Sequence, residues 1–300
     1  MNDEAIMFRK LTKKLYYHLP RPLRNYILFI YRVGYWPNFK NPKTYNEKIG
    51  YRKRNWDNEL FITCSDKIAV REYVAAVVGD KYLIESVYAD KGKVSEELLT
   101  SIVAKHGNVL VKANHNSGPV QFLYAESSSE TVRKVSEEIN RQLTHDYGGP
   151  KMEGWYSHIS RGVIIEKNIS ITGYDLPDYR FHVFNNIDGS QPKIIVNMDM
   201  DRELNHHRAV FDEEFNRLPF SWRVPDSQHA LLKPKNYDTM LAIAKDLAKP
   251  FSYVRVDLFN VNGRIYFGEM TFAHESGHGR FTPRSRDRWL GDLWTMDPAQ

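Results

Sequence analysis

Hydrophobic and polar residues alternate most clearly along residues 254–259. Three apolar side chains take one face of the predicted strand, and Arg255 and Asp257 take the other. After a glycine-containing turn the chain returns as a second alternating strand that carries Glu269 and Thr271. The pattern predicts a β-hairpin with an acid on each arm.

The turn of this hairpin decides which side chains share a face. A two-residue turn pairs Val261 with Arg264 and puts Glu269 on the face opposite to Asp257. A three-residue loop with a bulge at its glycine pairs Asn260 with Arg264 and brings both acids to one face. The sequence leaves both registers open.

In the three-residue register Arg255 lies opposite Glu269, Asp257 lies diagonal to Glu269, and Thr271 continues the same face. Two carboxylates a few ångströms apart repel each other unless a cation lies between them. Ligands that are all oxygen suit Mg²⁺ or Mn²⁺ better than zinc. The hairpin therefore predicts a metal site, and a surface hairpin with scattered charges is the alternative.

The spacing of hydrophobic residues along the chain also predicts the other helices and strands. Strands are expected at residues 108–114, 120–124, 162–169, 179–184 and 193–198. Amphipathic helices are expected at residues 65–79, 129–144 and 237–249, and two shorter ones at residues 8–16 and 26–33. Residues 199–208 are predicted to form a polar loop. Its neighbours His206 and His207 lack metal-binding helical spacing, which favours a loop role over zinc ligation.

Two lysines stand where an anion is expected. Lys67 lies in the first turn of the helix predicted to begin at Ser65, where free backbone amides favour a negative charge. Lys112 lies within a predicted strand, where a charge is costly unless it faces solvent or a ligand. The polar turn at residues 114–119 follows it and is able to fold over a phosphate chain. Exposed lysines are the alternative at both places.

Length and composition bound the class of protein. The 300 residues exceed the size that suits one core, so two or three subdomains around a cleft are expected. The 42% hydrophobic and 26% charged residues are those of a soluble globular protein. Cys64 is the single cysteine, which excludes an internal disulfide framework. The lack of a long apolar stretch and of a signal-peptide pattern favours a cytoplasmic location.

The net charge of +5 is concentrated in the first sixty residues and in residues 280–288, which favours anionic partners. No zinc-finger spacing, leucine-zipper heptad or aromatic RNA-binding signature is present, so nucleic acid is not an expected partner. The basic and aromatic residues 1–35 predict either shallow contact with the inner face of a membrane or docking on the main body.

Five stretches taken in order resemble the ATP-grasp superfamily, and within it the TupA-like ATP-grasp proteins, the group named for teichuronopeptide biosynthesis. The stretches are Asn46-Glu-Lys-Ile, Asp66-Lys67 with Val70-Arg-Glu-Tyr-Val, Val111-Lys-Ala-Asn-His-Asn-Ser-Gly, Asp178-Tyr-Arg-Phe, and Arg255-Val-Asp with Phe267-Gly-Glu-Met-Thr-Phe. They run from about residue 40 to residue 292.

This resemblance implies an α+β fold of the ATP-grasp type, in which two α/β subdomains clasp a nucleotide. The expected division is a basic helical N-terminal extension at residues 1–60, an N-terminal and lid subdomain at residues 61–161, and a C-terminal subdomain with the metal site at residues 162–300. ATP and Mg²⁺, or Mn²⁺, are the implied cofactors.

The resemblance also assigns roles to individual residues. The implied phosphate-binding lysines are Lys67 and Lys112, and the implied mobile loop over the phosphates carries His115, Ser117 and Gly118. The implied hinge that binds adenine has Glu166, Lys167 and Ile169, while Asp178 is implied for the ribose and Arg180 for the phosphates. The implied metal ligands are Asp257 and Glu269, with Thr271 where many relatives have asparagine. Arg255, Lys112 and Arg180 are the implied catalytic residues, which neutralise developing negative charge.

The implied reaction is amide formation through an acyl phosphate. A small carboxylate, such as the uronic acid of a surface polysaccharide precursor, and an amine, such as an amino acid or amino sugar, are the expected substrates; the acceptor is expected to be a lipid-linked or nucleotide-linked glycan. The residues expected to border its pocket are Ser276, Gly277, His278, Arg280, Arg284 and Arg286. A sugar kinase, a non-catalytic nucleotide- or glycan-binding protein and a glycosyltransferase are the alternatives, the last disfavoured because Asp199-Met-Asp201 lies in a predicted loop.

Overall fold

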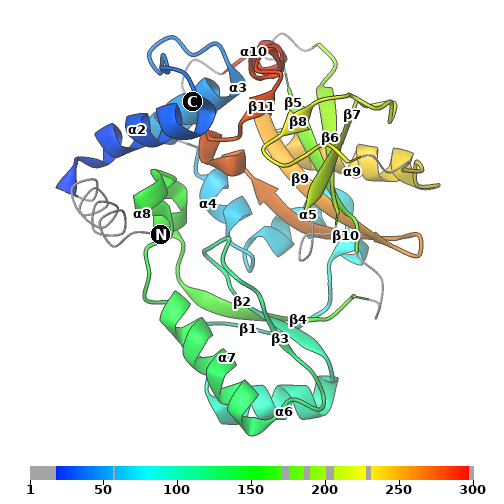
Figure 1. Ribbon diagram of the computed structural model, residues 1–300. Helices are drawn as coiled ribbons and strands as arrows, with labels where there is room; N and C mark the ends of the chain where they lie inside the picture. The colour runs from blue at the N-terminus through cyan, green and yellow to red at the C-terminus, as the bar shows by residue number, and fades with distance from the viewer. Residues whose placement is uncertain are drawn as a thin grey trace, which may run out of the picture.

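The computed structural model describes residues 18–56, 58–170, 176–185, 190–200, 206–227 and 231–296. Two antiparallel sheets form the body, the smaller at the bottom of Figure 1 and the larger at its upper right. The helix predicted at residues 8–16 lies outside the described residues.

The smaller sheet has the strand order β1-β4-β2-β3. Its strands are β1 (Ser86–Lys91), β2 (Val109–Ala113), β3 (Gln121–Leu123) and β4 (Gly162–Lys167). Two helices, α6 (Glu96–His106) and α7 (Ser129–Gln142), cover one face (Figure 1). Val109, Val111 and Ile165 pack into that core, while Lys112 takes the other face, as the alternation predicts. The boundary predicted between residues 161 and 162 falls directly before β4 and so separates this strand from β1 and β2, with which it pairs.

The larger sheet has the strand order β10-β9-β5-β6-β7. Its strands are β5 (Asp178–Phe184), β6 (Lys193–Met200), β7 (His207–Phe211), β9 (Tyr253–Val261) and β10 (Arg264–Thr271). The apolar side chains of β5 and β9, among them Phe181 and Val256, join the main core with α9 (Tyr237–Ala248). Because side chains alternate, the polar residues of these strands gather on the opposite face.

Short elements surround this polar face. They are α8 (Gly148–Lys151), η2 (Gly154–His158), β8 (Ser221–Trp222), η3 (His274–Gly277), β11 (Phe281–Thr282) and α10 (Ser285–Asp292); β8 pairs with β11. Nearer the N-terminus lie α2 (Arg21–Val33), α3 (Tyr45–Asn55), α4 (Leu60–Ser65), α5 (Val70–Val78) and η1 (Asp80–Tyr82). A capping box between Thr44 and Glu47 starts α3, which packs on α10 and η3.

The helix predicted at residues 65–79 corresponds to α5 alone, which begins five residues later than predicted. Ser65 ends α4 and Val70 begins α5, so the prediction of a helix start at Ser65 was wrong. The cause is Asp66, whose carboxylate accepts hydrogen bonds from the Ile68 amide and from Asn114, each at 2.8 Å, and so holds a turn. Lys67 therefore lies in the connection between two helices rather than at a helix N-terminus.

The polar loop predicted at residues 199–208 was also partly wrong. Strand β6 continues through Met200 and β7 begins at His207, so Asp199 faces Arg208 across the sheet. Both side chains are buried on the polar face.

Candidate active site

The acidic hairpin combines features of both expected registers. Val261 pairs with Arg264 across a two-residue turn, whose Asn262 and Gly263 have φ of 51° and 86°. A bulge before Glu269 then adds one residue to β10, so Glu269 pairs directly with Asp257. The turn is thus the two-residue form, but the two acids share one face.

Gly268 is the bulged residue, and its lack of a side chain matters here. A Cβ at this position would lie 3.1 Å from the backbone oxygen of Asp257, closer than an ordinary contact. Glycine therefore lets β9 and β10 approach where the bulge forms.

Arg255 holds both carboxylates. Its Nε and Nη2 donate to the two oxygens of Asp257 at 2.6 and 2.5 Å, and Nη2 donates to Glu269 at 2.5 Å. The Thr271 hydroxyl donates to the same Glu269 oxygen at 3.3 Å. Burial raises the pKa of Glu269, but the charges of Arg255 and Lys67 outweigh burial and lower it, so Glu269 is ionised.

These donors fit a Mg²⁺ ion that is completed by phosphates. Asp257 and Glu269 supply hard carboxylate oxygens side by side, and Thr271 adds a hydroxyl. Within the described ranges no group of three or more His, Cys, Asp or Glu side chains could hold a metal ion. A metal bound by this pair would therefore take its remaining ligands from nucleotide phosphates or water.

The two predicted phosphate lysines and the acidic hairpin line one cavity of about 260 Å³. Lys67 and Lys112 enter it from the front half of the chain, and Asp257 and Glu269 from the back half. Burial lowers the pKa of Lys67 to about 8, although Glu269 opposes this shift. Lys112 is held by Glu166 at 2.6 Å, which Arg71 also contacts at 3.1 Å.

Some of the other predicted nucleotide-binding residues line this cavity, and some do not. Those that line it are Ser117, Gly118, Glu166, Asp178 and Arg180. His115 is buried, with Nε2 at 3.2 Å from the backbone oxygen of His145. Lys167 pairs with Glu85 at 2.8 Å. His115, Lys167 and Ile169 are not among the residues that line either this cavity or its larger neighbour.

The larger cavity, of about 720 Å³, adjoins the first. The two share Ser117, Tyr156, Arg180 and Glu269. Ser276 and His278 line the larger cavity, as expected for an acceptor pocket.

The other predicted substrate residues lie outside both cavities. Gly277, with φ of 71°, packs against Ile49. Arg280 is exposed, Arg284 lies over the ring of Tyr35 at 4.2 Å, and Arg286 lies 5.3 Å from the rings of Phe220 and Trp289. The guanidinium groups of Arg284 and Arg286, which the sequence suggested as ligands of an anion, therefore pack on aromatic rings.

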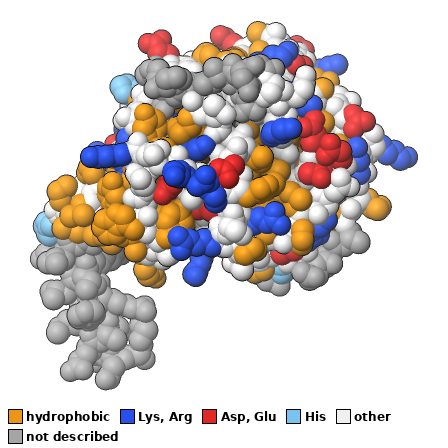
Figure 2. All heavy atoms as spheres, turned by 90° about the horizontal axis from the view of Figure 1, so that it is seen from above, with side chains coloured by type: hydrophobic (Ala, Val, Ile, Leu, Met, Phe, Trp, Pro, Cys, Tyr) orange, Lys and Arg blue, Asp and Glu red, His pale blue; other side chains and the backbone are white. Residues whose placement is uncertain are grey.

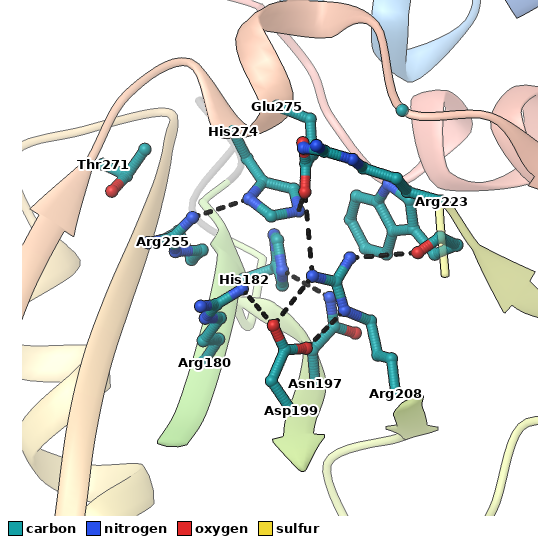
Figure 3. Close-up of polar contacts among 12 residues, drawn as sticks. Arg180, His182, Asn197, Asp199, Arg208, Arg223, Arg255, Thr271, His274 and Glu275 are labelled. Atoms are coloured by element: carbon teal, nitrogen blue, oxygen red, sulfur yellow. Dashed lines mark hydrogen bonds and ion pairs between the residues drawn. The ribbon is translucent and has the colours of Figure 1, made fainter. Parts of the chain in front are cut away.

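Asp199 is the centre of a network that the sequence analysis missed. Its carboxylate accepts from Arg208 at 2.5 and 3.0 Å and from Arg180 at 2.6 Å (Figure 3). His206 lies at 3.0 Å from the same carboxylate. Burial alone raises the pKa of Asp199, but the hydrogen bond and charge of Arg208 hold it well below its usual value. Arg180 reaches back to Asp178 at 2.9 Å and so joins this network to the nucleotide-side cavity.

Two buried histidines, His274 and His182, form hydrogen bonds with residues of the site and of its supporting strands. His274 accepts from Arg255 through Nδ1 at 2.6 Å. His182 contacts Tyr253 at 2.9 Å and Asn197 at 3.0 Å through its two ring nitrogens. Burial and nearby arginines place the pKa of both histidines well below the usual value, so both rings are neutral. A neutral His274 is able to accept a hydrogen bond from Arg255 and so fix the orientation of its guanidinium.

Comparisons with known proteins agree with the sequence resemblance. The sequence model of the family described as TupA-like ATPgrasp matches residues 47–295. No curated protein matches the chain.

Among solved structures, similarity is found to the D-alanine-D-alanine ligase of Helicobacter pylori, with 13% identity, a TM-score of 0.40, and coverage of 71% of this chain and 55% of that one. The D-alanyl-alanine synthetase A of Vibrio cholerae has 10% identity, a TM-score of 0.44, and coverage of 77% of this chain and 66% of that one. The ATP-grasp ligase PsnB, complexed with a minimal precursor, has 10% identity, a TM-score of 0.37, and coverage of 76% of this chain and 54% of that one. The chain thus spans 55% of the length of the first of these proteins.

Proposed function

The chain belongs to the TupA-like ATP-grasp family, and from this premise we propose that it is an ATP-dependent ligase that joins a carboxylate to an amine through an acyl phosphate. One observation carries the proposal: Lys67 and Lys112 line the same cavity as Asp257 and Glu269. Basic groups for phosphates and acidic groups for their metal thus meet in one space, although about 145 residues or more separate them in sequence.

The proposed roles follow from these contacts. Mg²⁺, when bound, would neutralise charge on the β- and γ-phosphates. Asp257 and Glu269 would hold it, with Thr271 as a weaker hydroxyl ligand. Lys67 and Lys112 bind the phosphates, and Arg180 orients them from the junction of the two cavities.

The proposed chemistry has two steps. A substrate carboxylate oxygen attacks the γ-phosphorus, which forms the acyl phosphate and breaks the bond to ADP. The amine then attacks the acyl carbon, loses a proton and displaces inorganic phosphate. Arg255 lies beside Glu269 at the border of the larger cavity and would stabilise the oxyanion of the second step.

The substrates of this proposal are an amino acid or amino sugar and a uronic acid of a bacterial surface polysaccharide precursor, on a lipid-linked or nucleotide-linked glycan in the cytoplasm. The family's association with teichuronopeptide biosynthesis supports this class. The larger cavity, which opens beside the proposed metal ligands, supplies the space.

The reaction type is tested by release of inorganic phosphate. We expect the wild-type protein with Mg²⁺-ATP to release phosphate only when a carboxylate and an amine are both present. A panel of uronic acids crossed with amino acids and amino sugars identifies the pair. Transfer of phosphate to a sugar without any amine would contradict a ligase and indicate a kinase.

Membrane contact through α2 is a second proposal. Leu23, Ile27 and Tyr31 form an exposed apolar stripe on this helix, at 45%, 40% and 84% exposure. Figure 2 shows hydrophobic side chains gathered at this end of the molecule, at the left. No helix in the described part of the chain is both long and apolar enough to cross a bilayer. The stripe instead suits an interface.

Vesicle sedimentation tests this contact. Replacing Ile27 and Tyr31 by serine is expected to weaken binding to anionic vesicles about tenfold, because each side chain loses apolar area that the interface would bury. Leu232→Ser, which changes an exposed leucine outside α2, serves as the control. Equal sedimentation of the double variant and the wild-type protein would contradict the contact.

A further inference from the structure

Helix α2 presents arginines to the larger cavity. Arg21, Arg24 and Arg32 line it, and Figure 1 shows α2 at the upper left, with β9 and β10 of the acidic hairpin farther to the right. These arginines recur at helical spacing with Asn25 and Leu28, which line the cavity too, so one face of α2 forms a wall of the cavity.

Positive charge exceeds negative charge in this cavity. Among the described residues that line it, eight are lysine or arginine and four are aspartate or glutamate. Three of the four acids are already engaged: Asp199 with Arg180 and Arg208, Glu269 with Arg255, and Glu275 with Arg223. The charges of Arg21 and Arg32 on α2 therefore remain in excess.

Side chains from three other segments line the cavity with Arg32. The charge of Arg32 lowers the pKa of Arg223, of Lys151 in α8 and of His278 after η3, in each case in addition to burial. In the described chain Arg32 makes no ion pair with an acid. Like charges gathered in this way destabilise the folded protein unless an anion is bound between them.

The size of the cavity also indicates an extended substrate. About 720 Å³ lies within the range of pockets that enclose drug-sized ligands. The reacting carboxylate and amine belong near Arg255 and Glu269, so the α2 side remains for another part of the substrate. Guanidinium groups match the geometry of phosphate and carboxylate oxygens.

We propose that Arg32, together with Arg223 and Lys151, binds an oxyanion that the acceptor carries in addition to its reacting group, and that Arg21, about 16 Å away along the axis of α2, extends the same positive wall. The oxyanion is either a phosphate or diphosphate of a carrier or a further carboxylate of an acidic glycan. This inference rests on the proposed function, whose acceptor it describes.

Titration calorimetry of the full chain tests the proposal with two probes, inorganic pyrophosphate and trigalacturonic acid. Each is titrated with and without a saturating non-hydrolysable ATP analogue and Mg²⁺, since pyrophosphate also suits the nucleotide phosphates' site. We expect at least one probe to bind in the presence of the analogue, and to bind about tenfold more weakly to the double variant Arg21→Gln, Arg32→Gln. The probe that responds identifies the source of the oxyanion.

The double variant Arg133→Gln, Arg264→Gln is the matched control, because it removes the same charge from side chains outside both cavities. Equal weakening in both double variants, or no binding of either probe, would overturn the proposal. Binding of the ATP analogue with Mg²⁺ is measured in separate titrations without either probe. Failure of the wild-type protein to bind the analogue would contradict the ligase function, whereas failure to bind either probe while the analogue binds contradicts only the α2 subsite.

Discussion

Replacing Glu269 by glutamine is expected to lower turnover about 100-fold or more while the protein remains folded. The amide keeps the size of the side chain and a contact with Arg255, but it removes one of two carboxylates proposed to hold Mg²⁺. Turnover is measured as ADP formation with the substrate pair that supports phosphate release. Affinity for Mn²⁺ in the presence of the ATP analogue is measured by electron paramagnetic resonance and should fall as well.

The matched control for this change is Glu214→Gln, an exposed carboxylate on the β7 side of the larger sheet. Its turnover and Mn²⁺ affinity should equal those of the wild-type protein. Unchanged turnover in Glu269→Gln would contradict the role of the hairpin in binding the metal ion.

Replacing Asp199 by asparagine is expected to cost about 3–5 kcal/mol of unfolding free energy at pH 7, because Arg180 and Arg208 would be left buried without their shared carboxylate. Urea denaturation measures the loss. Asp238→Asn is the control, since this carboxylate is 89% exposed and its pairing with Lys233 should contribute less than about 1 kcal/mol.

The same variant has a defined pH dependence. The folded-state pKa of Asp199 lies below its value in the unfolded chain, which is about 3.9. Its ionised form therefore stabilises the protein above about pH 4, and this contribution is lost as pH falls toward the lower folded-state pKa. The stability gap between the wild-type protein and Asp199→Asn should narrow between pH 5 and about pH 3. A gap that stays constant over this range would show that the charge of Asp199 is not what stabilises the network.

The acidic hairpin shows which structural features were predictable from the sequence and which were not. Alternation predicted its strands and the face shared by Arg255 and Asp257. The position of Glu269 depended on a bulge, which one of the two registers left open by the sequence had at Gly263 and which the structure has at Gly268. An isolated glycine inside a strand is itself a bulge signal, so Gly268 could have been recognised.

The cavity walls were harder to predict because distant segments build them. The alternation of Asn197 and Asp199 with apolar neighbours continues past the predicted end of its strand and would have revealed Asp199. Nothing in the local pattern of α2 says that its arginines face a cavity whose other walls are formed by residues 85 or more positions away. Arg284 and Arg286 illustrate the reverse case, since tertiary packing on aromatic rings removes from the cavity a basic patch that looked suited to an anion.

We propose that magnesium-bound ATP lies between Lys67 and Lys112 on one side and the acidic hairpin on the other. A crystal structure of the protein with Mg²⁺ and a non-hydrolysable ATP analogue would test this arrangement. We expect the triphosphate to contact both lysines and the metal ion to be ligated by Asp257 and Glu269. A nucleotide bound elsewhere, or one whose metal ion touches neither carboxylate, would contradict it.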